Sequence, residues 1–317
     1  MRVVFFGTPD DAVASLDALH DAGHDIALVV TQPDRRRGRR GNELIASPAK
    51  QRALELGLDV ATPEKSASIV DRVQALDAEL GVVVAFGQIL PPALLSATRS
   101  GCINLHFSLL PRWRGAAPVE RALLAGDTDT GVAIMAMEAG LDTGGIYFET
   151  RVPIDATVTA GELRATLVAI GAAMLVRELD LIPMAVARPQ IGDPVYAHKL
   201  SVAEFSLDPT RSAADLERIV RAAHPKPGAW VLVGGKRLKV LSAHVATDTD
   251  AGTGWGVVSG AGAELVGAFA IGEVSSDGLV VCGDGALVLD VVQPEGKKPM
   301  AARAWMAGMR ETVTLDG

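Results

Sequence analysis

The chain has 317 residues, of which 49% are apolar and 4% aromatic, and its formal net charge is −8 at pH 7. This length favours two domains over one, and the apolar content is sufficient for ordinary buried cores. The negative charge argues against a general nucleic-acid coat protein. It leaves room for local basic patches, because phosphate contacts depend on where arginine and lysine lie.

The two cysteines, Cys102 and Cys282, form no CxxC pair and no Cys/His cluster at metal-ligand spacing. Two lone thiols are typical of a reducing cytosol, although a disulfide between them stays open. The start, MRVVFFG, predicts a strand and lacks the features of a secretory signal peptide, and no apolar run reaches membrane-spanning length. We therefore expect a soluble, cytoplasmic protein without a membrane segment or a metal, and a monomer.

The N-terminal half alternates short apolar runs with helical patterns. Residues 2–6 predict a β-strand, a helix follows with Thr8 as N-cap and Pro9 at the first helical position, and residues 26–30 predict a second strand. This β-α-β order is typical of a Rossmann-like α/β fold, a parallel sheet with helices on both faces. One glycine at the first turn does not make the dinucleotide fingerprint, so NAD binding is not expected.

A run of arginines follows in QPDRRRGRRGNELI. It comprises Arg35, Arg36, Arg37, Arg39 and Arg40. Such a run repels itself and stays in solvent. One interpretation is a plain solvated loop; the other is a flexible arm that contacts RNA phosphates and becomes ordered on them.

Residues 80–86 form a continuous apolar run, as expected of a buried parallel strand. The run leads into Gly87, which permits close backbone approach, and then into Ile89 and Leu90, which offer apolar walls to a flat heterocycle. A simple strand-to-helix turn is the alternative interpretation.

The stretch GCINLHFSLLPRWRGAAPVERALLAGD, residues 101–127, places an amide and an imidazole on one predicted strand. Asn104 and His106 stand two apart, so their side chains project from the same face. Asp142 supplies a carboxylate from the turn AGLDTGG, after a strand predicted at residues 132–137. Loops at the carboxyl ends of parallel strands build the ligand crevice of such sheets, and we expect the segments after residues 86, 106 and 137 to meet there.

These three side chains suit the transfer of a carbonyl group between two nitrogens. Asn104 can donate N–H bonds to an oxyanion, and His106, tuned by Asp142, can help to move a proton. Each residue alone is more typical of a structural role. Their joint placement beside a Pro/Gly-rich loop favours chemistry, but spacing alone does not name the reaction.

The motif N-L-H-F-S-L-L-P-R-W-R-G, followed by G-L-D-T-G, resembles the formyltransferase family that uses 10-formyltetrahydrofolate. The resemblance extends from FFGTPD to QPEGKKPM, over nearly the whole chain. It implies transfer of a formyl group from that folate cosubstrate to the α-amine of methionyl initiator tRNA, with Asn104, His106 and Asp142 catalytic. It also implies a folate pocket made by Phe86, Gly87, Gln88, Ile89, Leu90, Ser108, Leu109, Leu110 and Pro111, and tRNA contacts from the arginine run, where Gly38-Arg39 matches a family element.

The C-terminal part differs in pattern. Residues 185–207 lose periodicity and predict a linker, which separates a catalytic domain at 1–184 from a domain at 208–317. Short strands between Gly-rich turns then predict a small antiparallel OB-like β-barrel. Its basic residues are either solvated charges or, by the resemblance, a tRNA-guiding surface, and they include Lys236, Arg237, Lys239, Lys297, Lys298 and Arg303.

Two other functions remain open from the sequence. One is a related formyltransferase or hydrolase that acts on a small amine or on the folate itself, and the other is a non-catalytic RNA-binding protein on the same scaffold. The arginine run and the predicted barrel favour tRNA as substrate. The intact Asn104, His106 and Asp142 argue against a protein without catalysis.

Overall fold

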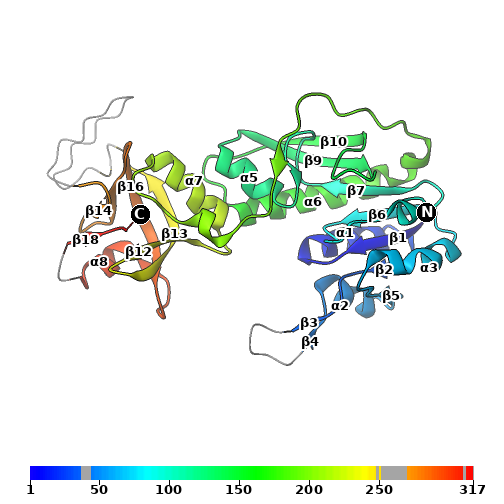
Figure 1. The fold of residues 1–317 in the computed structure, drawn as a ribbon, viewed down its shortest axis with the longest axis horizontal. Helices are drawn as coiled ribbons and strands as arrows, with labels where there is room; N and C mark the ends of the chain where they lie inside the picture. Colours follow the sequence, from blue (N-terminus) through cyan, green and yellow to red (C-terminus); the bar gives the residue numbers. More distant parts are fainter. Residues whose placement is uncertain (37–43, 248–249, 251–269, 310–311, 317) are drawn as a thin grey trace. The chain divides into compact units, whose positions relative to one another are not determined.

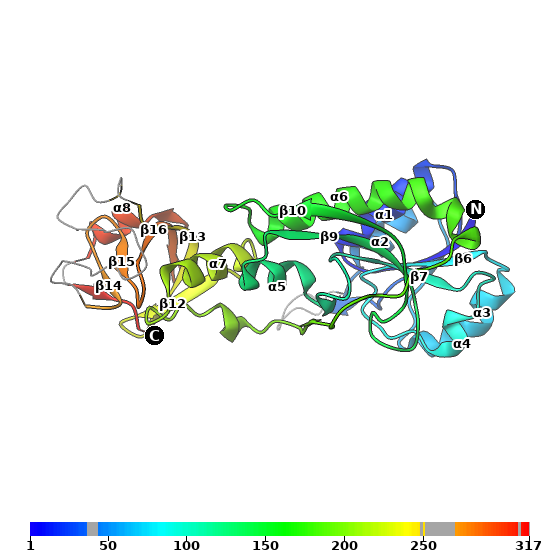
Figure 2. The ribbon, with the colours of Figure 1, turned by 90° about the horizontal axis from the view of Figure 1, so that it is seen from above.

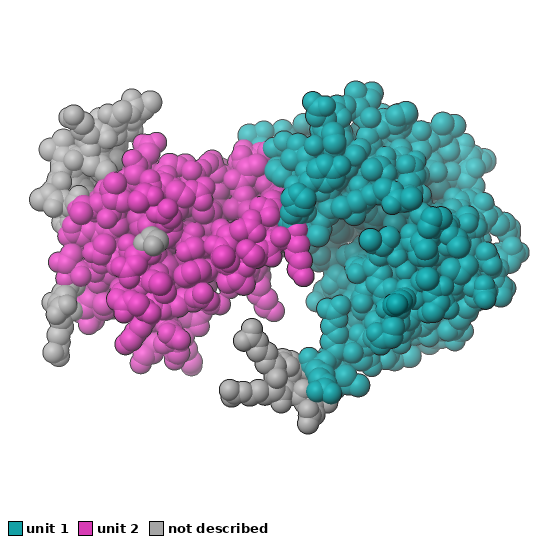
Figure 3. Space-filling view, viewed as in Figure 1, with its two compact units in different colours: residues 1–118, 128–154, 163–198 teal, residues 119–127, 155–162, 199–317 magenta. Residues whose placement is uncertain are grey.

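The structure, a computed structural model, describes residues 1–36, 44–247, 250, 270–309 and 312–316. The chain divides into two compact units (Figure 3). Unit 1 contains residues 1–118, 128–154 and 163–198, and unit 2 contains residues 119–127, 155–162 and 199–317. The segment expected as a linker is thus shared, since residues up to 198 belong to unit 1.

Unit 1 is built on a seven-stranded sheet with the strand order β10-β9-β7-β6-β1-β2-β5 (Figure 1). The strands β5, β2, β1, β6 and β7 pair in parallel, whereas β9 and β10 pair antiparallel. The Rossmann-like α/β fold predicted from the sequence is confirmed. The strands are β1 (Arg2–Gly7), β2 (Asp25–Val30), β5 (Val60–Ala61), β6 (Leu80–Val84), β7 (Cys102–His106), β9 (Asp129–Ala136) and β10 (Ile146–Pro153).

Helices cover both faces of this sheet, with α1 and α6 on one face and α3 and α4 on the other (Figure 2). All five residues of β6 are buried, as a parallel strand between two helical layers requires. On the face of α3 and α4, the core includes Val4, Phe6, Val83 and Leu94. The helices are α1 (Asp10–Asp21), α2 (Pro48–Glu55), η1 (Ser66–Ile69), α3 (Val70–Ala75), α4 (Pro92–Leu95), α6 (Ala160–Glu178) and η2 (Leu179–Met184).

Two short strand pairs are added to unit 1. Strand β3 (Arg35–Arg36) pairs antiparallel with β4 (Leu44–Ile45). Strand β8 (Arg114–Gly115) pairs in parallel with β11 (Tyr196–Ala197). Since β11 belongs to the segment expected as a linker, that segment is hydrogen-bonded to the motif that follows His106.

The direction of β9 corrects one expectation. Ala136 pairs with Ile103, Ala133 pairs with His106, and the Met137 N–H donates to the Cys102 carbonyl at 2.8 Å. The chain therefore leaves β9 at the amino end of β7. The segment after residue 137 does reach His106, with Asp142 3.7 Å away, but β9 is not a parallel strand that delivers it there directly. An apolar run predicts a strand but not its direction.

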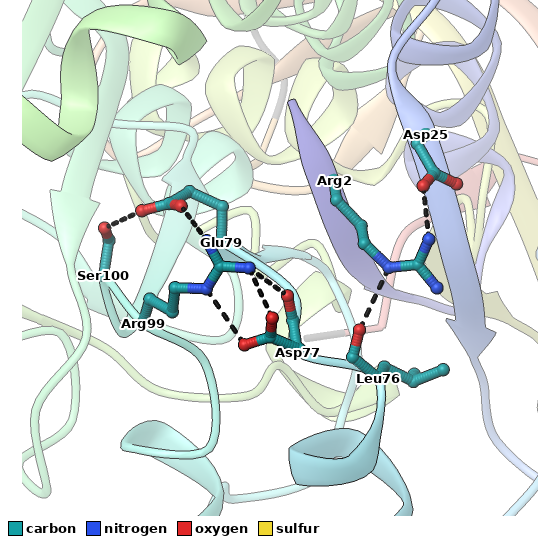
Figure 4. Close-up of polar contacts among 7 residues, drawn as sticks. All are labelled: Arg2, Asp25, Leu76, Asp77, Glu79, Arg99 and Ser100. Carbon is teal, nitrogen blue, oxygen red and sulfur yellow. Dashed lines mark hydrogen bonds and ion pairs between the residues drawn. The ribbon is translucent and has the colours of Figure 1, made fainter.

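The amino edge of the sheet is held by exposed ion pairs (Figure 4). Arg99 makes a two-pronged contact with Asp77, at 3.0 Å from Nε and 2.7 Å from Nη2, and lies 3.4 Å from Glu79. Arg2 donates to Asp25 at 2.6 Å and to the Leu76 carbonyl at 3.0 Å. These residues begin or precede the strands β1, β2, β6 and β7, so the network ties the sheet together at the edge opposite His106.

Unit 2 contains a curled antiparallel sheet with the order β12-β13-β16-β15-β14-β18, and β17 pairs with β16. A bridge between Leu232 and Asp316 connects β12 to the residues after β18, so the two edges approach one another. Helix α7 packs on β13 and β16. The predicted OB-like domain is confirmed as this curled, partly closed sheet.

Besides this sheet and helix α7, unit 2 contains shorter helices. The described elements are α5 (Pro118–Ala125), η3 (Val202–Phe205), α7 (Ala213–Ala223), β12 (Ala229–Val233), β13 (Lys236–Val245), β14 (Glu273–Val274), β15 (Leu279–Val281), β16 (Ala286–Pro294), β17 (Met300–Ala301), α8 (Ala302–Met306) and β18 (Val313–Thr314). Nowhere in the described ranges does a helix combine the length and apolar character that crossing a bilayer demands.

Candidate active site

His106, the last residue of β7, is held from both sides. Its side chain is 6% exposed, and its Nε2 donates to the Trp113 carbonyl at 2.9 Å. A carbonyl oxygen can only accept, so Nε2 carries a hydrogen. The other ring nitrogen, Nδ1, lies 3.7 Å from Oδ2 of Asp142. The imidazole therefore has a fixed orientation and presents Nδ1 toward a carboxylate.

Asp142 lies in the turn between β9 and β10 and has a backbone φ of 51°. Its side chain is 13% exposed, and Oδ2 accepts a hydrogen bond of 2.7 Å from the Gly115 N–H. Gly144 is required two residues later, because a Cβ there would lie 1.9 Å from the Ala136 carbonyl oxygen. The turn thus brings the Asp142 carboxylate back to the end of β7, although β9 runs antiparallel.

Asn104 projects from the same face of β7 as His106, as their spacing predicts. The intervening Leu105 points to the other face, where it meets Gly171 of α6. Asn104 is partly buried, and none of the described residues forms a hydrogen bond with its side-chain amide. This amide is consequently available to donate to a substrate.

The loop after β6 is fixed by side chains from three other segments. The Phe86 carbonyl accepts hydrogen bonds from the Thr8 hydroxyl at 2.8 Å and from Gln32 Nε2 at 3.2 Å. Thr8 was expected as the N-cap of α1, but the cap position is Pro9 and has no side-chain bond. Ser66 donates its hydroxyl to the Ile89 carbonyl at 2.6 Å. The backbone of this loop is therefore anchored at residues 86 and 89 by hydrogen bonds from other segments.

The side chains of the predicted folate residues differ in how far they are exposed. Ile89 is 84% exposed, whereas Leu90 is 3% exposed and packs in the core with Phe86, whose ring lies edge-on to Phe6 at 5.6 Å. Gln88 uses its amide inside the protein, donating to the Pro63 carbonyl at 3.0 Å and accepting from the Ser66 N–H at 2.7 Å. Of the two apolar walls expected here, the structure exposes Ile89.

The predicted residues beyond His106 form a tight turn. The Ser108 hydroxyl donates to the Arg112 carbonyl at 2.6 Å, and Leu110 is buried with Ala133 and Met135. Leu109 is partly buried, and the Pro111 carbonyl accepts from the Val195 N–H at 3.2 Å. This turn carries Trp113 and Gly115 back to His106 and Asp142.

The predicted basic residues lie in two places. Arg35 and Arg36 are exposed on β3, while Arg37, Arg39 and Arg40 lie outside the described residues. In unit 2, the pairing of Leu238 with Pro294 sets the start of β13 beside the turn after β16. The exposed residues that this pairing brings to one end of the two strands are Lys236, Arg237, Lys297 and Lys298.

Two of the other basic residues are already engaged. Lys239 donates to the Pro227 carbonyl at 3.0 Å, and Arg303 pairs with Asp277 at 3.3 Å. Arg237 stacks over Trp230, with the guanidinium carbon 4.1 Å from the ring centroid. Stacking uses the face of the guanidinium and leaves its N–H edges available to an anion.

Both cysteines are buried and free. Burial raises the pKa of Cys102 to about 12 and that of Cys282 to about 12, so neither thiol is a thiolate at neutral pH. Within the described residues, no three His, Cys, Asp or Glu side chains gather at a possible metal site. Among the described residues, the candidate chemical groups are thus the Asn104 amide, the His106 imidazole and the Asp142 carboxylate.

Comparison with known proteins identifies the family of the chain. The profile of the family described as Formyl transferase matches residues 1–179, and that described as Formyl transferase, C-terminal domain, matches residues 199–310. The chain belongs to the formyl transferase family. It is 45% identical over 317 residues to a methionyl-tRNA formyltransferase of Neisseria meningitidis, with 97% of each chain covered. It is 44% identical over 319 residues to that of Paracoccus denitrificans, with both chains fully covered.

Solved structures of formyl transferases share the fold. An N-formyltransferase from Helicobacter canadensis, in complex with folinic acid and dTDP-3-aminofucose, has a TM-score of 0.65 at 15% identity, covering 92% of this chain and 98% of that one. The methionyl-tRNA formyltransferase from Clostridium thermocellum has a TM-score of 0.54 at 14% identity, covering 78% and 94%. At these identities the likeness concerns the fold alone.

Sequence reasoning did not single out three contributors to this site. The Trp113 carbonyl and the Gly115 N–H hold His106 and Asp142 through backbone groups, which every residue type except proline shares. Gln190 contacts the Asp142 turn from the segment expected as a linker. Its signal in the sequence is one amide in a polar stretch without periodicity.

Proposed function

We propose that this formyl transferase moves the formyl group of 10-formyltetrahydrofolate to the α-amine of methionyl initiator tRNA. The sequence-based prediction of an enzyme that formylates methionyl-tRNA is confirmed by the identity of 45% to methionyl-tRNA formyltransferases over nearly their whole length. The observation that carries the mechanism is the His106–Asp142 pair on the face of β7 that also carries the available Asn104 amide.

The attacking group needs little activation. An α-amine in a peptide has a pKa of about 7.7 to 8.0, and the adjacent ester lowers it further, so a useful fraction is neutral at cellular pH. The nitrogen forms a bond to the formyl carbon, and the carbonyl electron pair moves onto oxygen. The site must then stabilise an oxyanion and transfer one proton.

Asn104 and His106 stabilise the oxyanion in this mechanism. The Asn104 amide donates one hydrogen bond. His106 acts as the imidazolium, with a hydrogen on each ring nitrogen, and donates from Nδ1 because Nε2 stays on the Trp113 carbonyl. The gap of 3.7 Å between Nδ1 and Asp142 is longer than a hydrogen bond, so the Nδ1–H of the imidazolium can donate to the substrate oxygen. Removal of one oxyanion donor typically costs about 10²- to 10³-fold in turnover.

Asp142 acts in the proton transfer. Its carboxylate accepts the proton that the attacking nitrogen loses and returns it to N10 of the folate as the bond from N10 to the formyl carbon breaks. The Gly115 N–H occupies one side of Oδ2 at 2.7 Å, so the remaining lone pairs receive the proton. One bond forms, one breaks, and the proton count is unchanged.

The hydrogen-bonded loop after β6 suits a flat heterocycle. Its backbone is held by Thr8, Gln32 and Ser66, and its exposed Ile89 side chain offers apolar surface to the face of a ring. We assign the folate pocket to the residues predicted from the sequence, with the backbone rather than the Gln88 amide as the polar partner. No step of the mechanism requires a metal.

The tRNA is assigned to basic residues in both units. We assign catalysis to residues 1–184 and tRNA binding to residues 208–317, through Lys236, Arg237, Lys297 and Lys298. The segment 185–207 connects them, and its part up to residue 198 belongs to unit 1. Their common place at one end of the β13–β16 pair supports this assignment. The arginine run at 35–40 supplies further phosphate contacts. The enzyme acts as a monomer in the cytoplasm.

Transfer of labelled formyl groups tests the proposal. 10-Formyltetrahydrofolate is offered with charged initiator tRNA, charged elongator tRNA and small amines in parallel. We expect labelled formylmethionine on the initiator tRNA. Preference for a small amine would reject the tRNA assignment, and release of formate without transfer would indicate a hydrolase.

A further inference from the structure

Gln190 lies in the segment that leads out of unit 1, beyond the family motif, yet its amide is fully engaged at the active site. Nε2 donates to the Asp142 carbonyl at 2.9 Å and to the Gly144 carbonyl at 2.8 Å. Oε1 accepts from Arg114 Nε at 3.0 Å and from Nη2 at 2.7 Å. Both amide hydrogens and the oxygen are thus used, all within unit 1.

The turn that Gln190 contacts needs stabilising contacts from residues outside it. Asp142 has a φ of 51°, in the left-handed region that non-glycine residues rarely adopt. Gly144 lies so close to β9 that a Cβ would meet the Ala136 oxygen at 1.9 Å. Contacts from outside the turn must therefore maintain it. The Gln190 amide hydrogens bridge the Asp142 and Gly144 carbonyls within the turn, and so hold the backbone that carries the Asp142 side chain.

The same amide also reaches the other partner of Asp142. Arg114, which donates twice to Gln190, precedes Gly115, whose N–H binds Asp142 Oδ2 at 2.7 Å. Gln190 therefore connects the backbone of Asp142 to the segment that holds the carboxylate of Asp142. A shift of one connection alters the distance of 3.7 Å between that carboxylate and His106 Nδ1.

We propose that Gln190 is a positioning residue for formyl transfer, which acts through Asp142 and does not touch substrate. The inference rests on the proposed proton-transfer role of Asp142. Gln190 can act in this way because its two amide hydrogens bind the turn and its oxygen binds Arg114 of β8. An exposed glutamine with one backbone contact would affect neither.

The test replaces Gln190 by methionine, which keeps the length but none of the hydrogen bonds. We expect kcat to fall about 10- to 100-fold, as for a misplaced catalytic group, with the KM values for methionyl-tRNA and the folate nearly unchanged. Gln51→Met is the matched control, because Gln51 Nε2 donates one exposed hydrogen bond of 2.9 Å to the Ala46 carbonyl. It should retain wild-type kcat.

A double-mutant cycle with Asp142→Asn separates positioning from general stability. If Gln190 acts through Asp142, Gln190→Met lowers kcat by less than about 3-fold in the Asp142→Asn background, because coupled residues are not additive. The same loss in both backgrounds would overturn the inference. Should Gln190→Met fail to fold, Gln190→Glu, which keeps the oxygen facing Arg114 and removes both donors, carries the same comparison.

Failure of the inference is distinct from failure of the proposed function. Wild-type kcat in Gln190→Met together with a low kcat in Asp142→Asn would reject Gln190 alone. Wild-type kcat in Asp142→Asn would reject the proton-transfer role itself, whatever Gln190 does.

Discussion

Gly115 has a backbone conformation that favours glycine, and it also donates a hydrogen bond to the proposed catalytic carboxylate. Its φ is 122°, and a Cβ there would lie 2.8 Å from the Ala197 carbonyl oxygen of β11. Its N–H also binds the Asp142 carboxylate at 2.7 Å. Gly115→Ala must therefore strain the backbone, displace β11, or move the N–H away from Asp142.

Two magnitudes follow from this geometry. The strained backbone costs about 1 to 3 kcal/mol of unfolding free energy, before the contact with Ala197 is relieved. Loss of a hydrogen bond to a charged group is worth about 1.5 to 3 kcal/mol, which corresponds to about 10- to 100-fold in kcat if the bond stabilises the transition state. We therefore expect Gly115→Ala to lose both stability and turnover.

Urea unfolding and steady-state formyl transfer measure these two losses. The control is Gly57→Ala, since Gly57 has a φ of 71° and nothing within 4 Å of its Cβ position. That variant should lose about 1 to 2 kcal/mol, the cost of a left-handed backbone, and keep its kcat. Equal unfolding losses in the two variants and wild-type turnover in Gly115→Ala would refute the reasoning.

Three further predictions concern other parts of the chain. Asn104→Ala should lower kcat by about 10²- to 10³-fold with unchanged tRNA affinity in filter binding. Replacing Lys297 by alanine should weaken tRNA binding for all sequences and reduce the slope of log Kd against log salt by about 1. The control is Arg177→Ala, which removes an arginine paired with Glu178 in unit 1 and should leave that slope unchanged. Burial lowers the pKa of His244, but Asp290 and Asp250 raise it more, so the folded pKa is raised overall. Protonated His244 therefore stabilises unit 2 below about pH 6.5, and this effect is lost as pH rises through the folded pKa. In urea unfolding, the stability difference between the wild type and His244→Gln should shrink over that range. A difference that grows with pH would contradict this prediction.

The fold was largely predictable because each element carries its own local signal. The buried run of β6 and the β-α-β start predict a Rossmann-like sheet, and the Gly-rich spacing after residue 228 predicts a small antiparallel sheet. The direction of β9 was not predictable, because periodicity describes which side chains are buried and not which way a strand runs. Thr8 was assigned to a helix cap on residue type, yet its hydroxyl binds the Phe86 carbonyl.

The site was predictable to the extent that it depends on spacing within one strand. Asn104 and His106 share a face of β7 because i and i+2 always do. The groups that orient the site could not be predicted, because the Trp113 carbonyl and the Gly115 N–H belong to the backbone and do not depend on residue type. Gln190 was hidden for another reason. Its partner Asp142 is 48 residues away in the chain, and a single amide in a polar segment gives no pattern to read.

The way Asp142 is held explains why a transferase with a sheet-based site depends on residues outside the sheet. His106 is placed by β7, but Asp142 follows a strand that leaves the sheet at the opposite edge. Its position comes from Gly115 and Gln190, and Gly115 in turn is held by the pairing of β8 with β11. The β8–β11 pair has only two residues in each strand, so it contributes little to global stability. Changes in residues 188–198 should therefore reduce turnover before they reduce the stability of the fold.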